Sequence, residues 1–134
     1  MTKEKKDDLF NEENIPASNW FKFDVVGAKV SGIVEEISTK KGSDGFKDQK
    51  VFALKQEDGS VMNVGISVDK TFILQRTNKV RVGDLLGFEF QKEIPATTKG
   101  HHPAKSIIPY IKYLPEGDAV REFEKTKKEF IPEN

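Results

Sequence analysis

The stretch KVFALKQEDGSVMNVGIS, from Lys50 to Ser67, carries most of the fold prediction. Asp58 and Gly59 in its middle are a dipeptide typical of a tight turn between two antiparallel strands. The residues on either side alternate apolar and polar on the period of two that indicates a half-buried strand. The predicted buried face of this hairpin consists of Phe52, Leu54, Met62, Val64 and Ile66. The predicted outer face consists of Val51, Ala53, Lys55, Val61, Asn63 and Gly65.

A long alternating run precedes this hairpin. Residues 20–38 read WFKFDVVGAKVSGIVEEIS, and Gly27 and Gly32 interrupt the alternation. Glycine inside a strand indicates a bulge or a bend, as in a sheet that curves toward closure. The polar stretch STKKGSDGFKDQKVF, residues 38–52, then joins this run to the hairpin. It is longer than a turn requires, so it is interpreted either as a solvated connector or as a segment that binds a ligand.

Three further elements are predicted after the hairpin. Residues 67–78 change to a helical period and predict one short helix. Residues 79–94 and 105–114 return to strand-like patterns and are joined by the polar loop PATTKGHHPA. Pro109 lies inside the last strand, and proline within a sheet favours an edge position. The predicted order is therefore strand, long loop, strand, tight turn, strand, helix, strand, loop and strand.

This order resembles that of the OB-fold, a small Greek-key barrel of five strands. Over residues 20–114 the chain is similar to the OB-fold single-stranded DNA-binding proteins of bacteriophage type. The resemblance rests on the element order, the glycine-broken first strand, the Asp-Gly hairpin turn and the Val82-Gly83-Asp84 start of the fourth strand. It implies a mainly β, OB-like barrel with one short helix between strands three and four. An SH3-like or other small β-barrel is the alternative.

The resemblance also implies a function. It predicts a non-catalytic protein that binds single-stranded DNA with little sequence preference, in DNA replication, recombination or repair. In the OB-fold, the loops after strands one and four and the face of strands two and three form the binding cleft. Single-stranded RNA is an alternative ligand. An alternative of a different class is a β-barrel adaptor that binds proteins of a replisome or a virion.

The charges divide the chain into three parts. Its 134 residues carry 22 basic and 22 acidic side chains, so the formal net charge is zero. Residues 1–17 read as a flexible leader, residues 18–114 as the barrel, and residues 115–134 as a charged tail. Both ends are acidic overall, which leaves the barrel mildly basic. Apolar spacing from Asp118 onward predicts that part of the tail is helical.

Several classes of site are not expected. The chain has no cysteine, which excludes disulfides, thiolate metal sites and a cysteine nucleophile. His101 and His102 are its only histidines, and neighbours on an extended chain point apart, so no metal site is predicted. There is no glycine-rich phosphate loop, and Asp58 and Asp84 are interpreted as turn residues. No enzymatic activity, cofactor or membrane span is expected, and the expected location is the cytoplasm, or the host cytoplasm for a viral protein.

Binding of a single strand needs cations for the phosphates and aromatic rings for the bases. The two predicted loops and the neighbouring strands supply both kinds of residue. Phe46 and Tyr110 are the predicted stacking residues, and packing over the open end of the barrel is the alternative for Phe46. The other predicted DNA-binding residues are Lys40, Lys41, Lys47, Lys50, Lys55, Asn63, Lys92, Lys99, His101, His102, Lys105 and Lys112.

The remaining aromatic residues receive other predictions. The predicted core residues among them are Trp20, Phe21, Phe23 and Tyr113. For the first three, a place along the binding cleft is the alternative. Acidic tails of cellular single-strand binding proteins end in a hydrophobic tip that recruits replication proteins, and the end of this chain is faintly similar. The residues that carry this similarity, and are predicted to bind partners, are Phe130, Ile131 and Pro132. A solvated end without a partner is the alternative.

Overall fold

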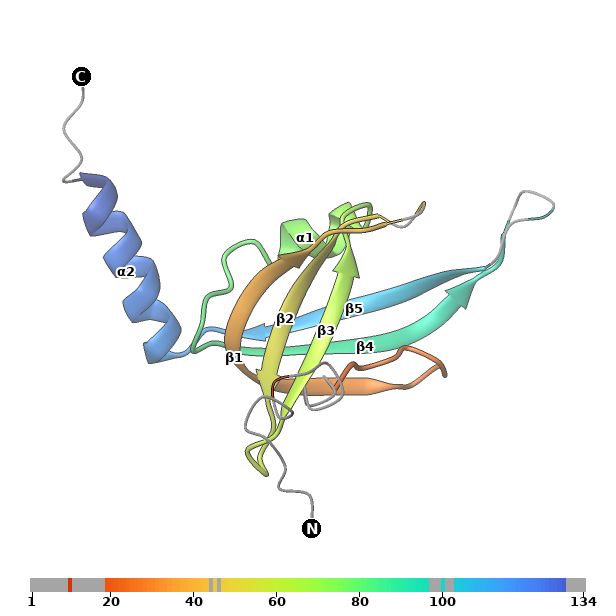
Figure 1. Ribbon diagram of the computed structural model, residues 1–134, viewed down its shortest axis with the longest axis horizontal. Helices are drawn as coiled ribbons and strands as arrows, with labels where there is room; N and C mark the ends of the chain where they lie inside the picture. Colours follow the sequence, from red (N-terminus) through yellow and green to blue (C-terminus); the bar gives the residue numbers. More distant parts are fainter. Residues whose placement is uncertain are drawn as a thin grey trace, which may run out of the picture.

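The structure is a computed structural model that describes residues 10, 19–43, 45, 47–96, 100 and 103–129. It contains a five-stranded antiparallel sheet and two helices (Figure 1). The elements are β1 (Lys29–Lys40), β2 (Gln49–Lys55), β3 (Val61–Ser67), α1 (Thr71–Arg76), β4 (Leu85–Ile94), β5 (Ala104–Lys112) and α2 (Pro115–Glu129). The mainly β class and the helix between the third and fourth strands are confirmed.

The central hairpin forms as predicted, with Phe52 of β2 paired to Val64 of β3. Both residues are fully buried. At the turn, Asp58 Oδ1 accepts hydrogen bonds from the Ser60 amide at 2.9 Å and from the Ser60 hydroxyl at 2.6 Å. Gly59 has a φ of 88°, a backbone conformation that favours glycine. Asp58 is therefore a turn residue, as the sequence indicates.

The run before β1 is not one continuous strand, contrary to the prediction. The Ala28 amide donates to the Val25 carbonyl at 3.0 Å, and Gly27 between them has a φ of 94°. This left-handed conformation closes a turn, so β1 begins only at Lys29. Residues 19–21 instead lie along the free edge of β3.

β1 changes its pairing partner partway along its length. Residues 29–33 pair with β4, and residues 33–40 pair with β2, with a bulge between Val34 and Glu36. β1 is visibly curved in Figure 1, where it connects the two halves of the sheet. β1 therefore contains an interrupting glycine and is curved, as the sequence predicts.

Gly32→Ala is expected to lower the free energy of unfolding by about 1–3 kcal/mol, the usual cost of overpacking. Gly32 is buried where β1 changes partner, and a Cβ atom there would lie only 2.5 Å from the Lys55 carbonyl oxygen. Backbone would have to move to relieve this contact. Denaturant unfolding measures the change, with Ser31→Ala at the exposed neighbouring position as a control that stays within about 0.5 kcal/mol. Wild-type stability of Gly32→Ala would contradict the prediction.

The sheet is open, with the strand order β3-β2-β1-β4-β5. A closed barrel would require β3 to pair with β5, and no ladder joins them in the described part of the chain, so the predicted closure is not confirmed. Helix α1 contacts β5 at this gap. The free edge of β3 is already hydrogen-bonded at Asn63 to residues 19 and 21. Pro109 lies in β5 and therefore on an edge strand, as predicted.

The core consists of buried side chains from the first four strands, from α1 and from the segment before β4. Phe52 and Phe88 lie at its centre, with ring centroids 5.8 Å apart. Phe21 and Phe23 pack against this core from the segment before β1. The Phe23 ring contacts the Phe88 ring edge to face at 6.5 Å. The core assignment of Phe21 and Phe23 is therefore confirmed.

Helix α2 follows β5 and projects away from the sheet (Figure 1). It begins at Pro115, earlier than the predicted start at Asp118, because proline is well suited to the first turn of a helix.

Tyr113 is 46% exposed, so the prediction that it is a core residue is wrong. It lies beyond the end of β5, where the Arg121 guanidinium is 4.6 Å from its ring centroid. Neither described helix is long and apolar enough to cross a membrane.

Asp84, at the start of β4, anchors α2 to the sheet. Its buried carboxylate accepts hydrogen bonds from the Arg81 amide at 2.8 Å and the Leu114 amide at 3.0 Å. The Arg121 guanidinium donates to both carboxylate oxygens. Burial alone raises the pKa of Asp84, but these hydrogen bonds outweigh burial and hold the pKa below its ordinary value. The turn assignment was therefore incomplete, since the carboxylate also joins β4 to α2.

Candidate nucleic-acid interface

Pairing along the free edge of β3 places Trp20 outside the core. The Asn63 amide donates to the Asn19 carbonyl at 2.8 Å, and the Phe21 amide donates to the Asn63 carbonyl at 2.9 Å. Trp20 is thereby the parallel bridge partner of Asn63. Neighbouring side chains of an extended segment point to opposite sides, so Phe21 reaches the core and Trp20 does not. The prediction that Trp20 is a core residue is wrong.

The Trp20 indole lies over Gly65 on the outer face of β3. A Cβ atom at Gly65 would lie 3.4 Å from Trp20 Cζ3 and 2.5 Å from Gln49 Oε1, so the absent side chain makes room for both groups. Lys40 Nζ lies 4.8 Å from the centroid of the Trp20 ring, within cation–π distance. Trp20 remains 38% exposed. We call Trp20, Lys40, Gln49 and Gly65 the Trp20 surface.

A small hollow adjoins the Trp20 surface and shares Lys40 and Gln49 with it. Its volume is about 210 Å³, and its lining consists of Lys40, Lys41, Gly42, Ser43, Lys47 and Gln49. Three of these side chains are cationic and none is acidic. The Gly42 amide donates to Asp48 Oδ1 at 2.9 Å, which folds the loop back beside the hollow. This lysine hollow has the size and charge to receive a phosphate group.

The described ends of the two predicted binding loops lie at one end of the sheet. Lys47, in the loop after β1, pairs with Asp69, in the turn after β3, at 3.3 Å. Asp69 also lines a cavity of about 280 Å³ with Ile94 and Lys105, which flank the connection between β4 and β5. Both partners of the Lys47–Asp69 pair are largely exposed, so water screens it and Lys47 can exchange Asp69 for another anion.

Two of the predicted phosphate-binding lysines face the protein instead. Lys50 Nζ lies 5.3 Å from the centroid of the buried Phe52 ring. Burial, and then the charge of Arg81, lower the pKa of Lys50. Lys105 Nζ donates to the Phe23 carbonyl at 2.6 Å, which braces the segment before β1. Neither ammonium group lines the lysine hollow.

The other described candidates are spread over the sheet. Lys55, at the end of β2, lies 3.8 Å from Glu35. Lys92 and Lys112 are exposed on β4 and β5, respectively. Asn63 serves through its backbone, which holds Trp20 in place. Of the predicted lysines that the structure describes, only Lys40, Lys41 and Lys47 meet at one hollow.

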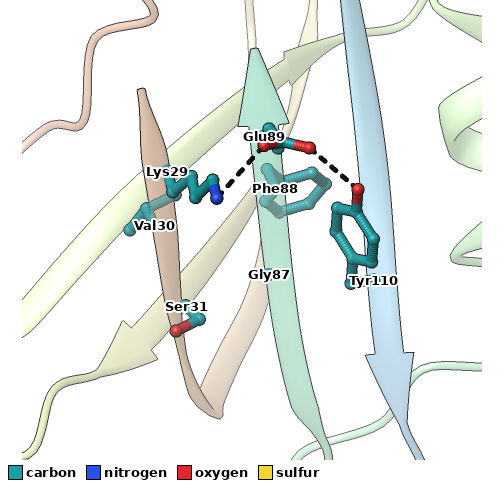
Figure 2. Close-up of a pocket in the computed structure, with 7 residues that line it drawn as sticks. All are labelled: Lys29, Val30, Ser31, Gly87, Phe88, Glu89 and Tyr110. Atoms are coloured by element: carbon teal, nitrogen blue, oxygen red, sulfur yellow. Dashed lines mark hydrogen bonds and ion pairs between the residues drawn. The ribbon is translucent and has the colours of Figure 1, made fainter. Parts of the chain in front are cut away.

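Tyr110 lies at a separate groove of about 450 Å³ on β1, β4 and β5 (Figure 2). Its hydroxyl donates to Glu89 Oε1 at 2.8 Å, and Lys29 Nζ lies 3.3 Å from Glu89 Oε2. The Tyr110 hydrogen bond, and then Lys29, lower the pKa of Glu89. Gly87 pairs with both Ser31 and Tyr110, so no side chain separates these two across β4. The exposed ring agrees with a stacking role, but it lies on the opposite edge strand from the Trp20 surface.

Several predicted residues lie outside the described part of the chain. They are Phe46, Lys99, His101, His102, Phe130, Ile131 and Pro132, and almost all of the predicted leader, residues 1–17. Their predicted roles stay predictions. Within the described residues, the aromatic ring beside the lysines of this loop is that of Trp20.

Sequence reasoning favours the core for Trp20, with the binding cleft as the alternative, and it missed the roles of Gln49 and Gly65. The one local signal was Gly65, because a glycine in a strand marks a place where another group approaches closely. Comparisons of the chain with protein-family models, with curated proteins and with solved structures found no match. The functional argument therefore rests on the geometry of the site.

Proposed function

We propose that this protein binds single-stranded DNA without catalysis and with little sequence preference, in DNA replication, recombination or repair. The observation that carries the proposal is the exposed Trp20 indole beside a hollow lined by three lysines. Stacking of a base on an aromatic ring contributes about 1–3 kcal/mol and tolerates any base. Lysine contacts to phosphates add affinity that is also independent of sequence.

We further propose that the open sheet is an incomplete OB-like barrel. Two observations support this. β1 pairs with both β2 and β4, and α1 follows the edge strand β3 in the chain and contacts the other edge strand, β5. In OB-folds the loop after strand one and the face of strands two and three bind the ligand. The lysine hollow lies in that loop, and the Trp20 surface lies on that face.

Lys40 connects the two halves of the proposed site. In the unbound protein its ammonium lies near the Trp20 ring, and the same side chain lines the lysine hollow. A base that stacks on the indole would displace the ammonium toward the phosphate that follows the base. Because the lysine stem has several rotatable bonds, this exchange needs no backbone movement.

The groove at Tyr110 is proposed as a second, independent stacking position. Glu89 beside the ring would repel a phosphate, so this groove suits a base rather than the backbone. Lys29 offsets part of that repulsion. Tyr110 would therefore add a base contact at some distance from the lysine hollow.

Binding of a fluorescent oligothymidine is expected to weaken as salt is added. Three lysine–phosphate contacts predict a slope of about −2 in a plot of log affinity against log salt concentration for a single strand. Lys41→Gln is expected to weaken binding and to make the slope shallower by about 0.7. Fluorescence anisotropy at several salt concentrations measures both quantities.

Lys125→Gln is the matched control for this titration, because Lys125 is exposed on α2 and does not line the hollow. It is expected to leave the affinity and slope unchanged. A wild-type protein with no salt-sensitive binding to the oligonucleotide would overturn the proposed function and favour the protein adaptor. Competition between matched DNA and RNA oligomers tests which nucleic acid is preferred.

A further inference from the structure

Helix α2 is attached to the rest of the protein through the side that carries Arg121 and, in its first turn, through Glu116, which lies against Gly83. Arg121 binds Asp84 and donates to the Lys79 carbonyl at 3.1 Å, and Glu124 accepts from Arg81 Nε at 2.7 Å. These contacts hold the helix at its first three turns. The helix spans about 22 Å at 1.5 Å per residue, and it projects from the sheet in Figure 1.

A second side of α2 carries a short coiled-coil seam. Glu116, Val120, Phe123 and Lys127 are separated by four, three and four residues, which is the spacing of successive d, a, d and a positions of a heptad. Phe123 is 67% exposed, Glu116 and Lys127 are also exposed, and Val120 is half-buried. The seam therefore has two apolar residues in its middle and one opposite charge at each end.

This seam is complementary to itself when two helices run antiparallel. A twofold axis between positions 121 and 122 places Val120 opposite Phe123 of a second helix, and Glu116 opposite Lys127. Each contact then occurs twice, as an isologous interface requires. Parallel helices would instead place Glu116 on Glu116 and Lys127 on Lys127, which repel.

We propose that α2 is an interface between two copies of this chain, paired antiparallel through Glu116, Val120, Phe123 and Lys127. The self-complementary charges favour a second copy over an unrelated partner. Glu116 also lines a hollow with Glu35, Lys55 and Val82. The two glutamates and the lysine give this hollow one net negative charge, and Lys127 of the other copy would lie beside it. The interface is small, so the dimer is expected to dissociate on dilution. The proposal does not depend on nucleic-acid binding.

Sedimentation equilibrium over a range of concentrations tests the proposal on the full chain, after removal of nucleic acid at high salt. The wild-type protein is expected to dimerise reversibly. Glu116→Lys and Lys127→Glu are each expected to weaken self-association about tenfold, because each turns two attractive contacts into two repulsive ones. An equimolar mixture of the two variants is expected to regain wild-type affinity as a heterodimer, in which both charge pairs are again opposite.

Two further variants separate the interface from folding. Lys125→Glu makes the same charge change as Lys127→Glu, but on a different side of α2. It is expected to leave self-association unchanged. Phe123→Glu is expected to abolish the dimer, while thermal unfolding of the monomer stays as in wild type because this side chain is exposed. A wild-type protein that stays monomeric at all concentrations would overturn the proposal. So would a mixture of the two charge variants that associates no better than either variant alone.

Discussion

Asp84→Ala is expected to lower the free energy of unfolding by about 3–5 kcal/mol, the usual cost of removing one partner from a buried ion pair. Asp84 is completely buried, whereas Arg121 is only partly so. The substitution would leave the Arg121 guanidinium without its main partner and the amides of Arg81 and Leu114 without an acceptor. Helix α2 would lose the contact that fixes its first turns. Denaturant unfolding at neutral pH measures the change.

The pH dependence of this effect follows from the lowered pKa of Asp84. A carboxyl whose pKa is lower in the folded protein than in the unfolded chain stabilises the fold above the unfolded value, about 3.9. That stabilisation disappears as the pH falls through the folded pKa. The difference in stability between wild type and Asp84→Ala is therefore expected to be largest near neutral pH and to shrink below about pH 4.

Asp118→Ala is the matched control for Asp84. Asp118 also binds Arg121, at 2.6 Å, but its side chain is 65% exposed. A solvent-screened pair of this kind contributes about 0–1 kcal/mol, so the control is expected to change stability little. If Asp84→Ala cost no more than Asp118→Ala, the anchoring role of the buried carboxylate would be contradicted.

Trp20→Leu is expected to weaken binding of an oligothymidine by about 1–3 kcal/mol, roughly 5- to 150-fold in the dissociation constant. The reason is the loss of an aromatic face beside the lysine hollow, since leucine cannot stack a base. Trp20 is the single tryptophan of the chain, so its fluorescence reports directly on that contact. Addition of the oligonucleotide is expected to quench the fluorescence of the wild-type protein.

Tyr113→Leu is the control for removal of an exposed aromatic ring. Tyr113 is similarly exposed but lies near α2, where its ring contacts Arg121. The Tyr113→Leu variant is expected to bind the labelled oligonucleotide as tightly as the wild-type protein. Two results together would remove Trp20 from the proposed interface. They are an unchanged affinity of the Trp20→Leu variant, and tight binding by the wild-type protein that leaves its tryptophan fluorescence unaltered.

Local features were predicted correctly where one short stretch contains the whole cause. The hairpin turn depends on Asp58, Gly59 and Ser60, which bond to one another or adopt the required φ themselves. The helix between β3 and β4 and the edge position of Pro109 follow from periodicity and from a missing backbone donor. These predictions need no information about distant residues.

The candidate site was predicted less completely, because it depends on pairing between distant segments. Alternation before β1 places Trp20 and Phe21 on opposite sides but does not say which of them faces the core. The bridge between Trp20 and Asn63 decides this. Lys50 shares a face of β2 with the buried Phe52, and Lys105 lies on the edge strand β5, so neither ammonium reaches the hollow.

Local sequence is thus sufficient for the two strands of the hairpin, their turn, the short helix and the apolar face of the hairpin, because turn chemistry and side-chain alternation act within a few residues. Tertiary contacts were needed for the open edge between β3 and β5, for the outward position of Trp20 and for the second role of Asp84. Asp84 bonds Arg121 across 37 positions of sequence, and no local pattern encodes such a contact. Its energy depends on burial and on geometry that exist only in the folded chain.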